Sequence, residues 1–373
     1  MFELTNEQRK YLGITLVSSA WDFIKLIPSP YDKHDTFAYF DGNTICKRII
    51  IGDNFYMEYD LNEETANCRT DLLPKTARGK IVKLTASTLE KRTPRGMCFL
   101  YKDGYVNLGK WETNRTFYDS YIEEIKLENF EDLSCWLKQW IKDTTVSDLN
   151  EIAEFSSSHK KHCKYRVGDF FRVKLNRRLY GYGRILLDYD KMRKEKMVFW
   201  DILMGKPLIV KIYHIITTNR NISCEELKEL KAIPSQFIMD NALYYGEYEV
   251  IGNLPLTDEE LDFPVMYGKS IDARDTNKIL LQSGQKYYEL LNKDCALFSD
   301  FRNNGVGFGI HVNLPILKRC IEMNSNQPYW VQNNYMTNED LRNPKFYSER
   351  EAICKQFRVS VDDIFLNLTT MRR

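Results

Sequence analysis

The segment Tyr165–Asp190 reads YRVGDFFRVKLNRRLYGYGRILLDYD and contains two extended runs, VGDFFRVKL and YGYGRILLDYD. Gly168 and Asp169 predict a turn before the first run, because glycine adopts the backbone angles that tight turns need. In the second run, Gly181 and Gly183 permit a bulge or a close approach of two backbones. The segment therefore predicts a small, strongly curved sheet.

The sequence after this segment predicts further strands and then helices. The runs KMVFWDIL, PLIVKIYHII and GEYEVIG have the composition of strands. Capping boxes predict helix starts at Ser223 with Glu226 and at Thr257 with Glu260. Beyond Phe263 the patterns QKYYELLN, LPILKRCIEM and SEREAICKQF favour helices, interrupted by a hairpin candidate at Asn304-Gly305.

The sequence before the segment predicts an antiparallel sheet between about residues 36 and 127. Its strand-like runs are TFAYFD, ICKRIII, FYMEYDL, MCFLYKD and YVNLGKW. Asp41-Gly42 separates two of these runs and is a hairpin signal, because glycine supplies the positive φ of the turn. The next stretch, FEDLSCWLKQWIKD, places its apolar residues at helical spacing, and DLNEIAEF predicts a second helix.

These patterns predict an α+β protein with several domains. A length of 373 residues exceeds one ordinary compact core. The polar, basic stretch SSSHKKHCK is the best domain boundary. We expect an α+β domain over 1–157, a curved β-rich domain over 164–268 and a mainly helical region over 269–373 packed on it.

The composition is that of an ordinary folded protein, with 43% hydrophobic and 28% charged residues. Nine scattered cysteines without a C-x-x-C pair predict reduced thiols rather than a disulfide framework or a zinc site. The first residues show no leader pattern, and no apolar run is long enough to span a membrane. We therefore expect a cytoplasmic protein that does not enter membranes.

The formal net charge of +1 is unevenly distributed. Seven basic residues lie between Lys75 and Arg95 against one glutamate, whereas Asp119 to Glu154 contains ten carboxylates against three lysines. Such stretches form solvated faces or pair within the chain, and either one can also steer a partner. The candidate acidic face comprises Glu123, Glu124, Glu128, Glu131 and Asp132.

A search for catalytic groups finds none. His159, His162 and Cys163 lie in the polar boundary stretch without a companion pair of metal ligands. The sequence has no G-x-S-x-G elbow, and the glycine-rich run at 305–309 lacks the Lys-Ser/Thr of a phosphate-binding loop. We expect a protein that is not an enzyme and that uses no metal or cofactor.

The Tyr165–Asp190 motifs, followed by GEYEVIGNLPL and Phe263-Pro264, resemble the bacterial immunity protein 26 family over about residues 164 to 268. The resemblance implies a cytoplasmic protein from a polymorphic-toxin locus that binds a cognate toxin domain and blocks it by occlusion, without chemistry of its own. The family-motif and partner-binding candidates are Gly168, Asp169, Tyr180, Tyr182 and Arg184. Tyrosine and arginine are favoured anchors in interfaces, so Tyr182 and Arg184 are the partner contacts to consider first.

Two other functions stay open at this stage. Some relatives in the family carry a phosphotriesterase label, and a hydrolase of that kind would need a metal cluster that the sequence does not display. A nucleic-acid-binding module would use Lys75–Arg95, although the near-neutral net charge and the lack of interleaved aromatic residues disfavour nucleic acid. The sequence identifies neither the toxin nor the oligomeric state.

Overall fold

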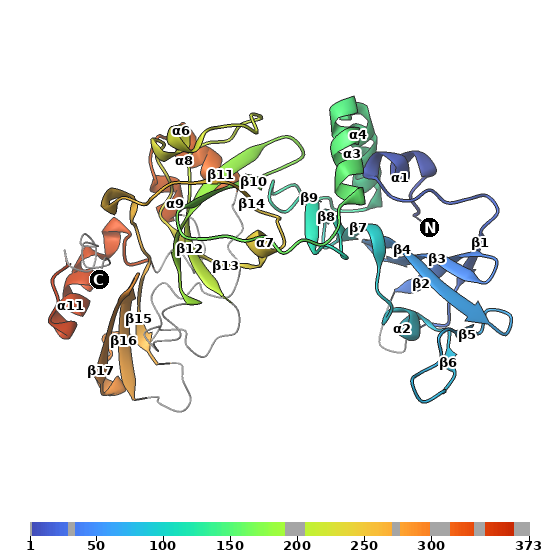
Figure 1. Cartoon of the computed structure of the whole chain (residues 1–373), viewed down its shortest axis with the longest axis horizontal. Helices are drawn as coiled ribbons and strands as arrows, with labels where there is room; N and C mark the ends of the chain where they lie inside the picture. The colour runs from blue at the N-terminus through green and yellow to red at the C-terminus, as the bar shows by residue number, and fades with distance from the viewer. Residues whose placement is uncertain are drawn as a thin grey trace. The chain divides into compact units, whose positions relative to one another are not determined.

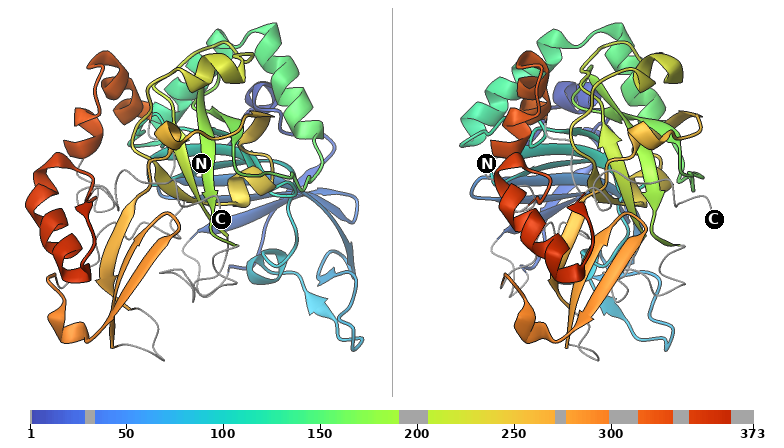
Figure 2. Two further views of the ribbon diagram at one scale, coloured as in Figure 1. Left: turned by 60° about the vertical axis from the view of Figure 1, so that its left-hand side comes forward. Right: turned by 90° about the vertical axis from the view of Figure 1, so that its left-hand side faces the viewer.

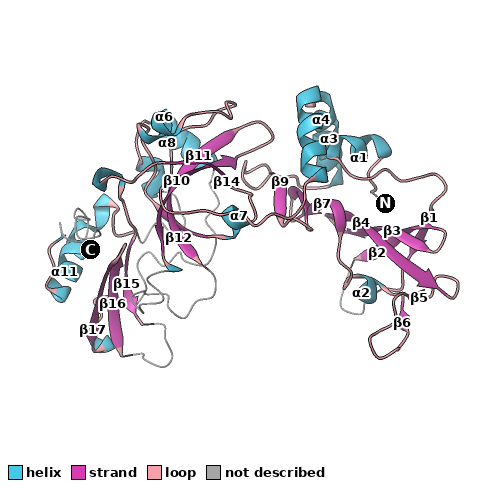
Figure 3. Cartoon of the chain, viewed as in Figure 1, coloured by secondary structure: helices cyan, strands magenta, loops and turns pink. Residues whose placement is uncertain are grey.

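The computed structural model describes residues 2–28, 34–190, 206–270, 277–298, 314–331 and 340–361. The chain divides into two compact units, Met1–His162 and Cys163–Arg373, and the division falls within the polar stretch SSSHKKHCK. Both units combine antiparallel sheets with separate helices, which confirms the α+β class (Figure 3). The further division of the second unit at residue 268 stays a prediction.

The first unit is built on a nine-stranded antiparallel sheet (Figure 1). The strands run in the order β1-β2-β3-β4-β7-β8-β9, with β5 beside β4 and β6 beside β5. Their bounds are Asp22–Lys25 (β1), Asp35–Asp41 (β2), Thr44–Gly52 (β3), Phe55–Ala66 (β4), Asp71–Leu72 (β5), Val82–Lys83 (β6), Arg95–Lys102 (β7), Tyr105–Lys110 (β8) and Arg115–Asp119 (β9).

The predicted hairpin at Asp41-Gly42 is confirmed. It joins β2 to β3, with Asp41 opposite Thr44 and Gly42 at φ +57°. This φ lies in the left-handed region that glycine enters without steric cost. The turn therefore fixes the register of the first long hairpin, as the sequence indicated.

Helices cover both faces of this sheet. They are α1 (Asn6–Leu12), α2 (Ala86–Leu89), α3 (Phe130–Asp143) and α4 (Val146–Ser157). Helices α1, α3 and α4 share one apolar core with the sheet, and α2 shares the core on the opposite face with β5 (Figure 1). The predicted apolar stripe of α3 is confirmed, because Leu133, Leu137 and Trp140 are buried in the first core.

The second unit contains two antiparallel sheets. A five-stranded sheet has the order β13-β12-β11-β10-β14, and a three-stranded sheet has the order β15-β16-β17. The strands are Asp169–Lys174 (β10), Tyr180–Asp188 (β11), Pro207–Ile212 (β12), Gln236–Met239 (β13), Glu249–Asn253 (β14), Val265–Lys269 (β15), Lys278–Ser283 (β16) and Lys286–Leu291 (β17).

The helices of the second unit are short. They are Cys224–Lys228 (α6), Asn241–Tyr244 (α7), Leu314–Glu322 (α8), Gln327–Val331 (α9) and Tyr347–Phe357 (α11), with 3-10 turns at Asp258–Glu260 (η1), Lys293–Cys295 (η2) and Pro344–Phe346 (η3). The capping boxes predicted at Ser223 and Thr257 are both present. Among the helices in the described ranges, none has the length and apolar character that crossing a membrane demands.

The helix predicted for QKYYELLN is wrong. These residues form β17, in which Tyr288 lies opposite Leu281 of β16. A turn through Gly284 at φ +56° returns the chain on itself, and Tyr288 and Leu290 pack in the same core as α11. Pairing and burial outweigh the local helical pattern, because strand preference depends on neighbouring strands. The predicted strand KMVFWDIL and the Asn304-Gly305 hairpin lie outside the described residues.

Arg342 joins the C-terminal part of the second unit to its central part. Its side chain is 8% exposed, and the guanidinium lies 2.8 Å from a carboxylate oxygen of Asp340 and 2.8 Å from one of Asp262. It also donates to the carbonyl of Ser235 at 2.7 Å. Burial would lower the pKa of Arg342, but these carboxylates hold it above its ordinary value. Charged hydrogen bonds therefore connect the residues after the three-stranded sheet to the residues next to β13 of the five-stranded sheet.

Candidate functional site

The β10–β11 hairpin carries the sequence motif, and its glycines are required by close packing. Gly168 has φ +88°, and a Cβ at that position would lie 2.5 Å from the carbonyl oxygen of Leu254. At Gly183 a Cβ would lie 2.4 Å from the ring of Phe171 and 2.6 Å from the carbonyl oxygen of Lys211. All three distances are shorter than real Cβ contacts. Gly168 therefore lets the segment after β14 approach the turn before β10, and Gly183 lets β10 and β12 approach β11.

Arg184 lies on β11 and is fully buried. Its guanidinium forms an ion pair with Glu260 and donates to the carbonyl oxygens of Leu254 at 2.6 Å and Pro255 at 3.1 Å. It also lies over the ring of Phe170, with 4.3 Å between the guanidinium carbon and the ring centroid. The side chain thus ties the central strand of the sheet to the segment that follows β14.

The 3-10 turn η1 positions Glu260 for the ion pair with Arg184. Glu260 accepts a hydrogen bond from the backbone N–H of Thr257 at 2.9 Å, which completes the capping box of η1. Lys211 of β12 lies 3.7 Å from the same carboxylate. Burial lowers the pKa of Lys211, whereas the Glu260 charge opposes that change. The Glu260 carboxylate therefore pairs with two buried cations, Arg184 and Lys211.

The other motif residues also point into the unit. Tyr182 is fully buried and donates its hydroxyl proton to the carbonyl of Asn219 at 2.6 Å. Asp169 accepts from the N–H of Arg166 at 2.8 Å and from the side chain of Asn253 at 2.7 Å. Tyr180 is buried as well, and the guanidinium carbon of Arg172 lies 5.4 Å from its ring centroid. The structure brings the five motif candidates together as a scaffold, and direct contact of Tyr182 and Arg184 with a partner stays a prediction.

The acidic candidates lie on one turn of the first unit, between β9 and the first turn of α3. Three of them, Glu124, Glu128 and Glu131, are exposed, and the other two are partly buried. Glu123 accepts a hydrogen bond from the Tyr118 hydroxyl at 2.7 Å, and Asp132 accepts from the N–H of Glu128 at 2.9 Å. These bonds hold the turn in shape while the remaining carboxylates face solvent.

Two large side chains that the sequence reading did not single out project from the same turn. Tyr121 is 59% exposed and Ile125 is 37% exposed. The Tyr121 ring lies edge-on to Tyr105 of β8, with 5.1 Å between the ring centroids. We refer to residues 119–132 as the acidic turn. It combines an exposed aromatic side chain with a rim of carboxylates, which is the usual composition of a protein-binding surface.

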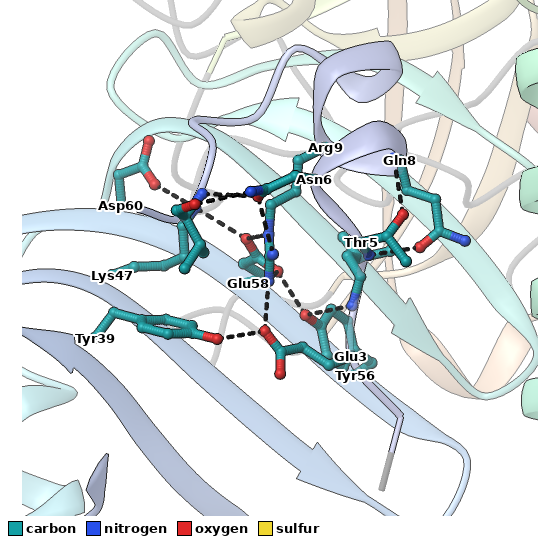
Figure 4. A network of polar contacts seen from close by, with 12 residues as sticks. Glu3, Thr5, Asn6, Gln8, Arg9, Tyr39, Lys47, Tyr56, Glu58 and Asp60 are labelled. Atoms are coloured by element: carbon teal, nitrogen blue, oxygen red, sulfur yellow. Dashed lines mark hydrogen bonds and ion pairs between the residues drawn. The ribbon is translucent and has the colours of Figure 1, made fainter. Parts of the chain in front are cut away.

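A buried ionic network in the first unit was also missed by the sequence reading (Figure 4). Glu58 of β4 is fully buried and receives two hydrogen bonds from Arg9 of α1, at 2.8 and 3.2 Å. Lys47 of β3 lies 2.9 Å from Glu58 and 2.6 Å from Asp60. The Tyr56 hydroxyl donates to Glu58 at 2.5 Å. Three groups, from Arg9, Lys47 and Tyr56, therefore converge on the Glu58 carboxylate beneath α1.

The electrostatics of this network favour the charged carboxylate. Burial would raise the pKa of Glu58, but the Lys47 charge and the hydrogen bonds from Arg9 lower it below the ordinary value. The signal in the sequence is the period of two, because Lys47 stands two residues before the buried Ile49 and so shares its face of β3. Ile45 packs in the core on the opposite face, since a bulge between Ile45 and Lys47 interrupts the alternation. Since each charged group is paired inside the unit, the network fixes α1 on the sheet.

The described part of the chain contains no candidate metal site. No group of three or more His, Cys, Asp or Glu side chains there could hold a metal ion. His159 and His162 are exposed, and Cys163 is partly buried. His214 lies half-buried after β12, where burial lowers its pKa. The structure therefore does not assemble the His159, His162 and Cys163 group considered from the sequence.

A comparison with family models finds Immunity protein 26 over residues 166–278. The matched segment runs from the turn before β10 to the first residue of β16, which includes the five-stranded sheet, Arg184 and Glu260. No curated protein and no solved structure matches the chain. The family match confirms the resemblance stated for the central segment, which covers less than a third of the chain.

Proposed function

We propose that the chain is an immunity protein that binds a cognate toxin domain in the cytoplasm and blocks it by occlusion. The observation that carries this proposal is the Immunity protein 26 match over residues 166–278. The chemistry of the described residues supports binding rather than catalysis, because the buried carboxylates of Glu58 and Glu260 are each paired with buried cations inside their own unit. In this account the chain performs no reaction and needs no cofactor.

The acidic turn is the surface we propose for toxin recognition. Glu124, Glu128 and Glu131 present negative charge, and Tyr121 supplies an exposed aromatic anchor. Carboxylates on such a surface accelerate encounter with a basic partner and disfavour acidic ones. A basic toxin domain, such as one that itself binds nucleic acid, has the complementary charge.

The motif residues contribute to the same function through the scaffold. Gly168, Asp169, Tyr180, Tyr182 and Arg184 hold the curved β10–β11 hairpin against the segment after β14. In our proposal these five residues stabilise the fold of the second unit, and the toxin-binding surface lies in the first unit. Their substitution would therefore reduce the amount of folded protein before it changed the contacts with the toxin.

The function is tested by co-expression with the toxin encoded beside this chain. We expect cells that produce both proteins to survive toxin induction, and the two proteins to purify as one complex. Survival without a complex would contradict occlusion, and loss of both would contradict the immunity function altogether. Residual toxin activity measured in the purified complex reports directly on the block.

The surface is tested by charge reversal. The triple variant Glu124→Lys, Glu128→Lys, Glu131→Lys is expected to weaken the complex at least tenfold, since it replaces three attractive charges by repulsive ones. A matched control carries the same charge change at three other exposed glutamates, Glu90, Glu225 and Glu229. Equal weakening by both variants would show a general charge effect and would remove the acidic turn from the proposal.

A further inference from the structure

A projecting β-ribbon in the first unit is not explained by the immunity function. Strands β5 and β6 pair through Asp71 with Lys83 and Leu72 with Val82, and residues 73–81 form the tip (Figure 2). The tip is ordered by its own hydrogen bonds, because the N–H of Thr76 donates to Lys80 at 3.0 Å and Gly79 donates back to Thr76 at 2.7 Å. The ribbon extends away from the sheet on the side opposite α1, α3 and α4 (Figures 1 and 2).

The tip of this ribbon concentrates cations. Lys75, Arg78 and Lys80 are exposed, and within the described part of the chain none of them has an ion pair. Lys83 at the base differs, because it lies 2.6 Å from Asp71. Three like charges on one short hairpin repel each other, so the fold gains no stability from their placement. Their arrangement is explained if an anion binds the tip.

The other side chains of the tip distinguish between kinds of anionic partner. The segment 73–81 has no aromatic residue, and its one large exposed apolar side chain is Ile81, which is 45% exposed. Protein interfaces usually depend on aromatic or arginine anchors set in apolar pockets. Contacts to nucleic-acid phosphates need only positioned cations. The grooves of a duplex also admit a two-stranded β-ribbon.

We propose that the β5–β6 ribbon binds the phosphate backbone of duplex nucleic acid, without reading its sequence. Lys75, Arg78 and Lys80 each contact a phosphate, and the ribbon lies along a groove. The proposal is independent of toxin binding, which we place on the acidic turn. The near-neutral charge of the whole chain does not oppose it, because phosphate contacts act over about 10 Å at ordinary ionic strength.

Salt dependence gives the expected size of the effect. With three phosphates neutralised, the logarithm of the binding constant falls with the logarithm of salt concentration at a slope of about −2.7. Between about 50 and 200 mM salt the affinity is then expected to drop about 40-fold. Sequence should have little influence, since the contacts reach the backbone and not the bases.

The experiment titrates the full chain into a short fluorescein-labelled DNA duplex of arbitrary sequence and follows anisotropy at several salt concentrations. Wild type is expected to bind with the slope given above. The triple variant Lys75→Gln, Arg78→Gln, Lys80→Gln is expected to lose binding at the lowest salt. The control Lys102→Gln, Lys138→Gln, Lys142→Gln has the same charge change at exposed lysines of the first unit outside both proposed surfaces and is expected to bind like wild type.

Three results would overturn the proposal. The first is no binding of wild type to the duplex at low salt, and the second is equal binding by the ribbon variant. The third is binding to poly-glutamate with no binding to the duplex, which would indicate an acidic protein partner instead. Thermal unfolding of each variant verifies its fold, and the wild-type salt slope tests the proposal without any variant.

Discussion

The two units of this chain use charged residues differently. In Cys163–Arg373 the family motif and its charges are buried, with Arg184 and Glu260 enclosed by the sheet. Met1–His162 also encloses an ionic network, yet its surface separates an acidic turn from a basic ribbon. The segment that matches the family model is thus built from scaffold residues, while the two surfaces that we propose for partners lie in the first unit, outside the matched residues 166–278.

This difference matters for interpreting a family match. A motif of glycines, aromatics and one arginine is recognisable because close packing admits few substitutes at those positions. Surface charges that select one partner have no such constraint. A family match therefore indicates which residues build the scaffold. The recognition surface has to be located from the exposure and the charge of other residues.

The largest expected effect is on the buried network of the first unit. Glu58→Gln leaves Arg9 and Lys47 without their shared carboxylate, and breaking a buried pair of this kind costs about 3–5 kcal/mol. Chemical denaturation of the variant should show an earlier transition for the first unit. The control Glu64→Gln, on the exposed end of the same strand, is expected to change stability by less than about 0.5 kcal/mol. Equal stability of Glu58→Gln and wild type would show that the network contributes nothing.

A smaller loss is expected in the second unit. Arg184→Met removes the ion pair with Glu260 but leaves Lys211 at 3.7 Å from that carboxylate, so we expect a cost of about 3 kcal/mol. Arg166→Met, at an exposed arginine of the same segment, is the matched control. Denaturation followed for both units should show that only the second transition moves. A shift of the first transition instead would contradict the separation into two units.

The same glycine-to-alanine substitution is expected to cost more stability at Gly168 in the second unit than at Gly42 in the first. Gly168→Ala places a methyl group 2.5 Å from the Leu254 carbonyl at a positive φ, and we expect a loss of about 2–3 kcal/mol. At Gly42, φ is also positive but no atom lies within 4 Å of the added Cβ. Gly42→Ala is therefore expected to cost only about 1 kcal/mol. Similar losses at both positions would remove the close-packing argument for the motif glycine.

The smallest expected effect is on pH dependence. The folded pKa of Glu58 is lowered, so its stabilising contribution is present above the ordinary carboxylate pKa of 4.5 and is lost as pH falls through the lowered value. Denaturation of wild type and Glu58→Gln across acidic pH should show their stability difference shrinking below that point. A difference that stays constant throughout the acid range would contradict the lowered pKa.

Local signals in the sequence predicted much of the fold. The Asp41-Gly42 turn, the α3 stripe and the capping boxes depend on residues a few positions apart, and all are present. The segment QKYYELLN became a strand because β16 and α11 surround it, which no local pattern encodes. Pairing over long sequence distance also explains why the network around Glu58 was missed.

The candidate site was predictable only in part. The acidic residues were found from composition, but Tyr121 and Ile125 became candidates only once their exposure was known. For Arg184 the sequence indicated a strand residue among tyrosines, and the structure places its guanidinium against the carbonyls of Leu254 and Pro255. Those acceptors lie some seventy residues further along the chain.

The most direct test of the central claim is the dissociation constant of the complex between this chain and its cognate toxin domain, measured by titration calorimetry. Our account predicts a tight one-to-one complex that the Glu124→Lys, Glu128→Lys, Glu131→Lys variant weakens at least tenfold. The control variant at Glu90, Glu225 and Glu229 should keep wild-type affinity. Absence of a complex with the folded wild-type chain would contradict the account.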